Sequence, residues 1–276
     1  MKKNIISAWE KVEIARNPKR KTALEYIENI FDDFIELHGD RHFSDDKAMV
    51  CGLAKIGKQN YTIIAEQKGR TTKENIERNF GMPNPESYRK AIRFMKQAEK
   101  FNRPIITFID TKGAYPGIGA EERGQGEAIA RSMFEMARVT VPVISIVIGE
   151  GSSGGALAIG VSNKIYMMEH AIYSILSPEG YSSILWKDST RYKEAAEKMK
   201  LTAKDLYDLK IIDNIIKEPI KYEENTFKDI TTEIKKLIIN DINEMKELNK
   251  EKLVEQRYKK FRNISGYKEV HNVIEE

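Results

Sequence analysis

The 276-residue sequence lacks several features that would reveal a function at once. Its one cysteine, Cys51, excludes an internal disulfide and a zinc site built from several cysteines, and we expect it to be a small buried side chain. No apolar run approaches the ~18 residues that a membrane span requires, and the start lacks the apolar core of a secretory signal. We therefore expect a cytoplasmic protein without a membrane partner.

The excess of positive charge is also small. A formal net charge of +4 is spread over a chain in which 32% of the residues are charged and 41% are apolar. This composition is typical of a soluble globular protein, and it does not predict a nucleic-acid partner.

The apolar pattern predicts an α/β fold. Continuous apolar runs alternate with amphipathic segments, as expected for a parallel sheet covered by helices on both faces. The expected strands are 49–56, 61–66, 104–110, 141–148 and 164–168, and the expected helices are 22–37, 87–101, 121–138 and a short one from Gly154.

The two ends of the chain differ from this middle part. Residues 1–21 are polar and basic and are expected to form an arm, residues 22–220 the main domain, and residues 221–276 a charged helical segment. Apolar residues recur in that segment at helical spacing, namely Ile230, Ile234, Leu237, Ile238, Ile242 and Met245. Its charges indicate a solvated helix face, and the alternative is a clamp on a partner subunit.

Two glycine-rich stretches follow neighbouring predicted strands. They are DTKGAYPGIG (110–119) and GEGSSGG (149–155), and ligands bind outside the carboxyl ends of strands in open α/β sheets. Gly154 and Gly155 begin the short helix, so their N–H groups have no partners within it and can hold an oxyanion. The alternative is that both glycines only permit tight packing of helix on sheet.

The stretch Gly151–Gly155 also fits G-x-S-x-G, the turn that presents a serine nucleophile in many hydrolases. A triad would need a histidine downstream of Ser153, and only His170 and His271 are available there. Neither is well placed for that role. The sequence has no phosphate-binding loop of the G-x-x-x-x-G-K-[ST] type, no complete dinucleotide fingerprint and no metal-ligand cluster.

With these motifs, residues 9–263 resemble the carboxyltransferase alpha subunits of bacterial acetyl-CoA carboxylase, which have a crotonase-like fold. Two positions depart from that family, which usually has proline at Lys112 and glycine at Ser152. The resemblance is carried by GDR (39–41), DDKA (45–48), QKGR (67–70), RNFGMP (78–83), FIDT (108–111), GAYPG (113–117), GAEERGQ (119–125) and SPEG (177–180).

The resemblance implies a fold and a reaction. The fold would be a spiral of ββα units with an N-terminal helical arm and a C-terminal helical tail. The reaction would move a carboxyl group from carboxybiotin to acetyl-CoA and give malonyl-CoA, the first committed step of fatty acid synthesis. The N–H groups of Gly154 and Gly155 would form the oxyanion hole for biotin. The implied substrate-binding residues are Gly113, Ala114, Tyr115, Pro116, Gly117 and Gly151.

The resemblance also implies partners. These are a beta subunit that binds acetyl-CoA and bears a zinc ribbon, the biotin carboxyl carrier protein that holds biotin, and biotin carboxylase. Two alpha and two beta chains would form a heterotetramer, and this chain would hold no metal.

Other functions remain open on the residues alone. A self-contained acyl-CoA enzyme would need a carboxylate aimed at its substrate, and Glu121, Glu122 and Glu150 lie near the glycine-rich stretches, although each is expected to be a helix-start or surface acid. A serine hydrolase and a non-catalytic scaffold are further alternatives. If backbone donors act, valine at Gly155 is expected to block them while the fold survives.

Overall fold

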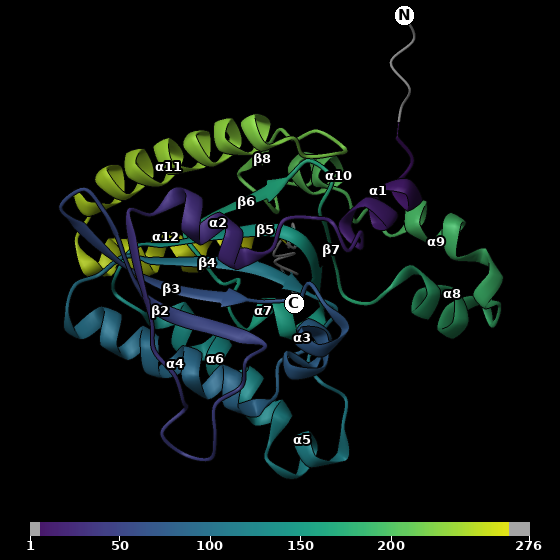
Figure 1. The fold of residues 1–276 in the computed structure, drawn as a ribbon, viewed down its shortest axis with the longest axis horizontal. Helices are drawn as coiled ribbons and strands as arrows, with labels where there is room; N and C mark the ends of the chain where they lie inside the picture. The colour runs from purple at the N-terminus through teal and green to yellow at the C-terminus, as the bar shows by residue number, and fades with distance from the viewer. Residues whose placement is uncertain (1–5, 265–276) are drawn as a thin grey trace, which may run out of the picture.

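The computed structural model describes residues 6–264 and is built around one mixed sheet of eight strands. The strand order is β1-β2-β3-β4-β5-β6-β8, and β7 pairs with the end of β5 (Figure 1). The strands are β1 (Asp33–Glu36), β2 (Met49–Ile56), β3 (Gln59–Glu66), β4 (Ile105–Thr111), β5 (Val143–Ser152), β6 (Lys164–Met168), β7 (Ile172–Ser174) and β8 (Asn214–Ile216).

Strands β3 to β6 and β8 are parallel, whereas β1, β2 and β3 pair antiparallel. In Figure 1, α2 and α11 cover one face of the sheet, and α4 and α6 cover the other. Every residue of β4 and β5 is buried, as continuous apolar strands require. The helices are α1 (Ala8–Ala15), α2 (Ala23–Ile30), α3 (Thr72–Glu77), α4 (Pro85–Lys100), α5 (Ile118–Glu122), α6 (Gln125–Arg138), α7 (Ser153–Leu157), α8 (Pro178–Trp186), α9 (Tyr192–Lys198), α10 (Ala203–Asp208), α11 (Glu224–Lys246) and α12 (Lys250–Asn263).

The helix predicted over 22–37 is wrong in its second half. Helix α2 ends at Ile30, and Asp33–Glu36 pairs with β2 as an edge strand. The pairing needs Gly52, because a Cβ there would overlap the carbonyl oxygen of Ile35 and the ring of Phe34. Pairing with β2 thus overrides a pattern that also fits a helix.

The helix predicted over 121–138 is two helices. Gly124 lies between α5 and α6 and has φ +81°, a left-handed backbone conformation that a residue without a Cβ adopts readily. The helix is interrupted at this residue. The strand predicted over 141–148 is longer than expected and reaches Ser152. The strand predicted over 164–168 is confirmed at both ends.

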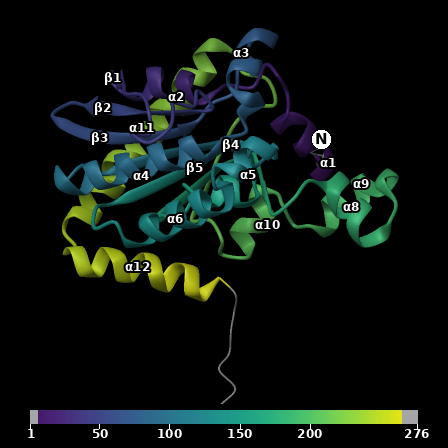
Figure 2. The ribbon, with the colours of Figure 1, turned by 90° about the horizontal axis from the view of Figure 1, so that it is seen from below.

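The N-terminal arm contains one short helix. Ser7 and Glu10 form a capping box at the start of α1, which packs against α9 at the side of the sheet. Figures 1 and 2 show α1, α8 and α9 together as a lobe beside the main body. Its small apolar cluster contains Ala8, Val12, Ala15, Ile172, Ala196 and Leu201.

The C-terminal helices pack on the main domain. The apolar stripe of α11 is buried in the core shared with the sheet, so these apolar side chains are not free to bind another chain. The alternative that this charged segment clamps a partner subunit stays a prediction. Helix α12 then runs past the end of α6, as Figure 2 shows. Buried Arg257 of α12 donates to the carbonyl oxygens of Met136, Val139 and Val141 and thereby caps α6.

Candidate functional site

The two glycine-rich stretches meet at the carboxyl ends of β4 and β5. Strand β5 ends in a sharp turn at Ser153, hereafter the elbow, and the φ of +56° at Ser153 is left-handed. Holding a non-glycine residue there costs about 1–3 kcal/mol. The turn brings α7 into position with its first N–H groups beside the loop after β4.

The N–H groups of Gly154 and Gly155 lie in the first turn of α7. That turn has no side-chain cap, and within residues 6–264 neither N–H donates to a loop carbonyl or a side chain. Ser153 is exposed, Gly154 is half-buried and Gly155 is buried. The two N–H groups therefore have no protein partner outside the helix in the described residues, and that of Gly154 lies nearer to solvent.

Gly155 also has a packing role. A Cβ built on it would lie 2.8 Å from the amide nitrogen of Ala114 and 2.9 Å from the carbonyl carbon of Gly113. Valine at Gly155 was expected to leave the fold intact, but its side chain would strike the backbone of the neighbouring loop, so the loop or the helix would have to shift. Gly155 therefore permits close packing of α7 against the loop after β4, and its N–H group has no loop or side-chain partner in the described residues.

The loop after β4 is held by hydrogen bonds. The hydroxyl of Thr111 lies 2.6 Å from the carbonyl oxygen of Gly81 and accepts from the N–H of Gly113 at 3.0 Å. The N–H of Tyr115 donates to Pro83, and the side-chain amide of Gln125 donates to the carbonyl oxygens of both Pro83 and Tyr115. This loop is thereby tied to the segment between α3 and α4.

The other expected binding residues lie at differing depths. Ala114 is half-buried against the core, whereas Tyr115 and Pro116 are exposed beside the elbow. Gly117 begins α5 beneath the ring of Tyr115. Gly151 lies inside β5, where a Cβ would approach the ring of Tyr173 to 2.8 Å, so its lack of a side chain is explained by packing.

A buried ionic cluster lies beneath both loops. The ammonium of Lys68 lies 2.6 Å from Asp110 Oδ1 and 3.3 Å from Glu150 Oε1. Arg16 binds Glu150 at 2.8 Å and Glu179 of α8 at 2.7 Å, so it joins the lobe to the sheet. Glu150 was expected to be a surface or helix-start acid, and this is wrong, because its side chain is 2% exposed.

The pKa values follow from these contacts. Burial alone would raise the pKa of Glu150, but Lys68 and Arg16 outweigh it and hold that pKa below its usual range. Burial would likewise lower the pKa of Lys68, but Asp110 and Glu150 raise it. Glu66 accepts from the N–H of Asp110, and burial raises its pKa well above the usual value. The cluster thus combines Lys68 and Arg16 with the carboxyl groups of Asp110 and Glu150, and the buried carboxyl group of Glu66 lies next to Asp110.

Sequence reasoning did not single out Lys68, Asp110 or Arg16 as site residues. Lys68 and Asp110 do occur in the motifs QKGR and FIDT, and a charged residue at the end of a fully apolar strand is the signal that could have identified Asp110. Arg16 carries no such local signal. Its partners are 134 and 163 positions away in the chain.

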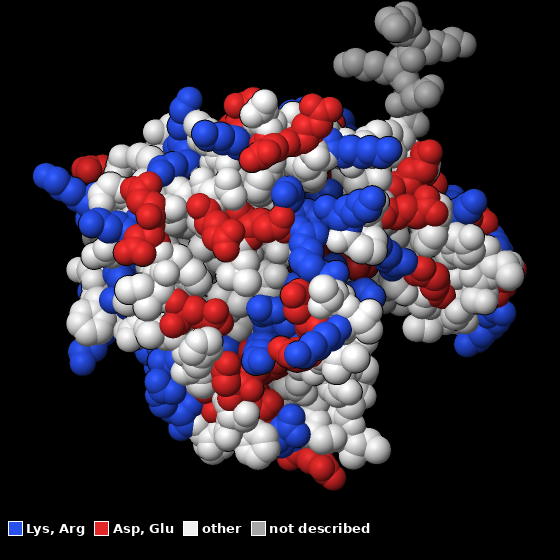
Figure 3. Space-filling model, in the orientation of Figure 1, with Lys and Arg blue, Asp and Glu red and all other residues white. Residues whose placement is uncertain are grey.

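Two hollows of about 520 Å³ each flank the elbow. The charged one contains Arg16, Lys68, Lys112 and Glu150, and Figure 3 shows blue side chains gathered on the face between α1 and α3. The apolar one is lined by side chains of α7, α10 and α12 and of the residues that follow β7, α10 and α12: Leu157, Ile175, Leu206, Ile211, Phe261 and Ile264.

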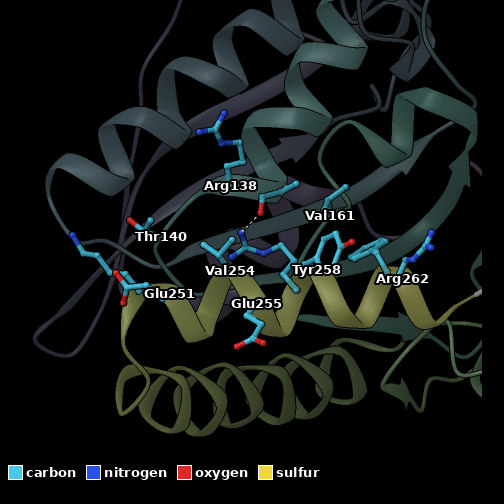
Figure 4. A pocket seen from close by; sticks show the side chains of 12 residues that line it. Arg138, Thr140, Val161, Glu251, Val254, Glu255, Tyr258 and Arg262 are labelled. Carbon is cyan, nitrogen blue, oxygen red and sulfur yellow. Dashed lines mark hydrogen bonds between the residues drawn. The ribbon is translucent and has the colours of Figure 1, made fainter.

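A larger cavity of about 690 Å³ lies elsewhere, between α6 and α12. Figure 4 shows Val161, Val254 and Tyr258 lining it, with Arg138 and Glu255 at its edges. It is mostly apolar and lies away from both glycine-rich loops, so it is not the place of the proposed chemistry.

The geometry does not favour the serine hydrolase. Within the described residues no hydrogen bond joins Ser153 to a histidine, and His170 is buried beside Glu218. Burial lowers the pKa of His170. The other candidate, His271, lies outside the described residues.

Within residues 6–264, no group of three or more histidine, cysteine, aspartate or glutamate side chains is placed to hold a metal ion. No helix in this part of the chain has the length and apolarity to cross a membrane. Cys51 is buried, as expected for a small apolar side chain.

Comparison with known sequences decides the family. A profile of the family described as "Acetyl co-enzyme A carboxylase carboxyltransferase-like" matches residues 2–265. The chain belongs to the acetyl-CoA carboxylase carboxyltransferase family. The acetyl-coenzyme A carboxylase carboxyl transferase subunit alpha of Clostridium botulinum (strain Alaska E43 / Type E3) is 60% identical over 260 residues, which cover 94% of this chain and 95% of that protein.

A second relative of this carboxyltransferase joins two subunits in one chain. The acetyl-coenzyme A carboxylase carboxyl transferase subunits beta/alpha of Clostridium tetani (strain Massachusetts / E88) is 56% identical over 266 residues, which are 96% of this chain and 46% of that one. The name of that protein thus couples an alpha part to a beta part.

Solved structures confirm the expected crotonase-like fold of this carboxyltransferase. The crystal structure of transcarboxylase 12S with methylmalonyl-coenzyme A bound superposes with a TM-score of 0.63 at 20% sequence identity. The match covers 78% of this chain and 42% of that one. At this identity the likeness concerns the fold alone.

Proposed function

We propose that this chain is the alpha subunit of the carboxyltransferase component of acetyl-CoA carboxylase and that it acts together with a beta subunit. The observation that carries the proposal is the pair of unpaired N–H donors at Gly154 and Gly155, set at the carboxyl end of β5 in a chain of this family. The fused beta/alpha relative supports the need for a beta partner. The proposed product is malonyl-CoA.

The donor pair fits the group that the family uses. Biotin, held on a separate carrier protein, would supply the carboxyl group. Gly154 and Gly155 would bind an anionic oxygen through two neutral N–H groups at the positive end of a helix, which suits an oxygen that gains charge during transfer. Such donors need no proton exchange. Removing one typically costs ~10²–10³ in rate.

We assign one donor pair to the described part of this chain, whereas the reaction creates negative charge in two places, on biotin and on the acyl thioester. We assign the second donor pair, acetyl-CoA binding and the zinc ribbon to the beta subunit. The carrier protein, biotin carboxylase and an assembly of two alpha and two beta chains belong to the same proposal.

The decisive experiment removes one donor without adding a side chain. Glycolic acid in place of Gly155 replaces the amide by an ester, which deletes the N–H and weakens the carbonyl oxygen of Gly154 as the acceptor for the N–H of Ala158. In the complex reconstituted with the beta subunit, malonyl-CoA formation from carboxybiotin and acetyl-CoA should fall ~10²–10³-fold. The unmodified chain without its partner should be inactive.

Gly126 is the matched control. It is an exposed glycine in the first turn of α6, with no atom within 4 Å of a built Cβ, and the same ester there should leave the rate unchanged. Equal rates for the two ester proteins would show that the N–H of Gly155 is not used.

A further inference from the structure

The pairing of β4 with β5 changes register directly below the two loops. Ile109 lies opposite Val147, but Thr111 lies opposite Gly151. Asp110 alone therefore faces the three residues Ile148, Gly149 and Glu150, so β5 bulges by two residues at this point. The bulge sets how far each strand extends before its loop begins.

Side chains satisfy the backbone groups that the bulge leaves without ladder partners. Asp110 Oδ1 accepts from the N–H of Glu150 at 2.9 Å, and Arg20 donates to the carbonyl oxygen of Ile148 at 2.7 Å. Gly149 makes room for this arrangement, because a Cβ there would overlap the carboxylate of Asp110. The bulge is thus built around a buried aspartate.

Lys68 is the group that makes this arrangement stable. Its ammonium lies between Asp110 and Glu150, whose side chains are 6% and 2% exposed, and without it Asp110 would be a buried carboxylate with no cation in contact. An uncompensated buried charge is strongly unfavourable. The bulge would then relax toward regular pairing or open to water.

The consequence reaches the donors through packing. The loop that leaves β4 after Thr111 contacts Gly155 through Gly113 and Ala114, within 3.1 Å of a built Cβ. A change in the register of β4 relative to β5 would shift that loop along α7 and move it away from the N–H groups of Gly154 and Gly155.

We propose that Lys68 is a positioning residue: through Asp110 and Glu150 it holds the β4–β5 bulge that places the loop after β4 against the Gly154–Gly155 donors. The effect on catalysis rests on the proposed function, whereas the effect on loop geometry does not.

The test compares Lys68→Met with Lys68→Arg and with a matched control. Lys90→Met removes another buried lysine of the same kind, since Lys90 lies 2.6 Å from Asp45 and its side chain is 0% exposed. Hydrogen exchange of the isolated chain should speed up about tenfold in segments 111–117 and 149–156 for Lys68→Met. Lys90→Met should leave those segments unchanged, and Lys68→Arg should restore most of the protection.

In the complex with the beta subunit, Lys68→Met should lower kcat about 10²-fold while KM for acetyl-CoA changes less than about threefold. Wild-type exchange in both segments of Lys68→Met would overturn the proposal, and so would faster exchange with unchanged kcat in an active complex.

An inactive wild-type complex would count against the proposed function only, and the exchange result would still decide the positioning role. If Lys68→Met does not fold, Asp110→Asn keeps the acceptor for Glu150, removes the charge and should give the same pattern at smaller size.

Discussion

The two loops at the site are held in opposite ways. The loop after β4 has its polar groups satisfied by Thr111, Gln125 and the segment before α4. The elbow after β5 contains Ser153 in a strained left-handed conformation and is held by the packing of Gly155 against the loop after β4. The N–H groups of Gly154 and Gly155 have no loop or side-chain partners in the described residues. The loop after β4, with its polar groups satisfied, is thus a fixed support against which the unpaired N–H groups of Gly154 and Gly155 are packed.

The largest effect is expected from a substitution that pushes the loop after β4 away from the N–H groups of Gly154 and Gly155. Gly155→Val places a branched side chain against the backbone of Gly113 and Ala114, which lies within 3.1 Å of a built Cβ. Overpacking of this kind costs about 1–3 kcal/mol of unfolding free energy. We expect carboxyl transfer by the reconstituted complex to fall more than ~10²-fold, because the loop and the donors separate.

Gly154→Ala is the control for that variant. A Cβ at Gly154 would meet only the side chain of Ile129, at 3.1 Å, and a side chain can move where a backbone cannot. Rates and melting temperatures of both variants check the prediction. Equal losses in the two would mean that contact with the loop is not what makes Gly155 special.

A milder change removes hydrogen bonds within the loop after β4 and leaves the shape of its side chains nearly unchanged. Thr111→Val leaves the buried carbonyl oxygen of Gly81 and the N–H of Gly113 without the Thr111 hydroxyl. We expect a loss of about 1–3 kcal/mol in unfolding free energy. The transfer rate should fall about tenfold, since the loop that supports the donors is loosened.

Thr107→Val separates loop effects from general stability. Its hydroxyl donates to Ser145 at 2.8 Å inside the sheet, four residues earlier on the same strand. Denaturant unfolding should show a comparable loss of stability for this variant, but its transfer rate at a temperature where it is folded should stay near wild type. A similar fall in rate for both variants would argue against a special role of the loop.

Much of this fold can be predicted from the sequence, because β4, β5 and β6 are continuous apolar runs and α4 is long and amphipathic. The glycine-rich stretches also identify the edge of the sheet where the donors lie. The edge strand β1 could not be predicted. Phe34 and Ile35 fit a helical stripe as well as an alternating strand, and only pairing with β2 decides between the two.

The ionic cluster is harder to predict for a different reason. Lys68 and Arg16 look like surface residues in the sequence, and their contacts depend on partners that are far away in the chain. Lys68 and Glu150 are 82 positions apart. The bulge that unites them arises from sheet register, which local composition does not encode.

The smallest expected effect belongs to the residue that first suggested a hydrolase. Ser153→Ala keeps a Cβ at the left-handed position, so the backbone strain of the elbow is unchanged, and within the described residues the Ser153 hydroxyl takes part in no hydrogen bond. We expect the transfer rate to stay within about threefold of wild type, equivalent to ~0.65 kcal/mol, and the melting temperature to be unchanged. If Ser153 were the nucleophile, the same substitution would instead lower the rate by several orders of magnitude. Reconstitution with the beta subunit and a rate measurement distinguish the two, and a fluorophosphonate probe adds a second readout. Stoichiometric labelling of Ser153 would mean that the hydroxyl, and not the N–H groups that follow it, is the reacting group of the elbow.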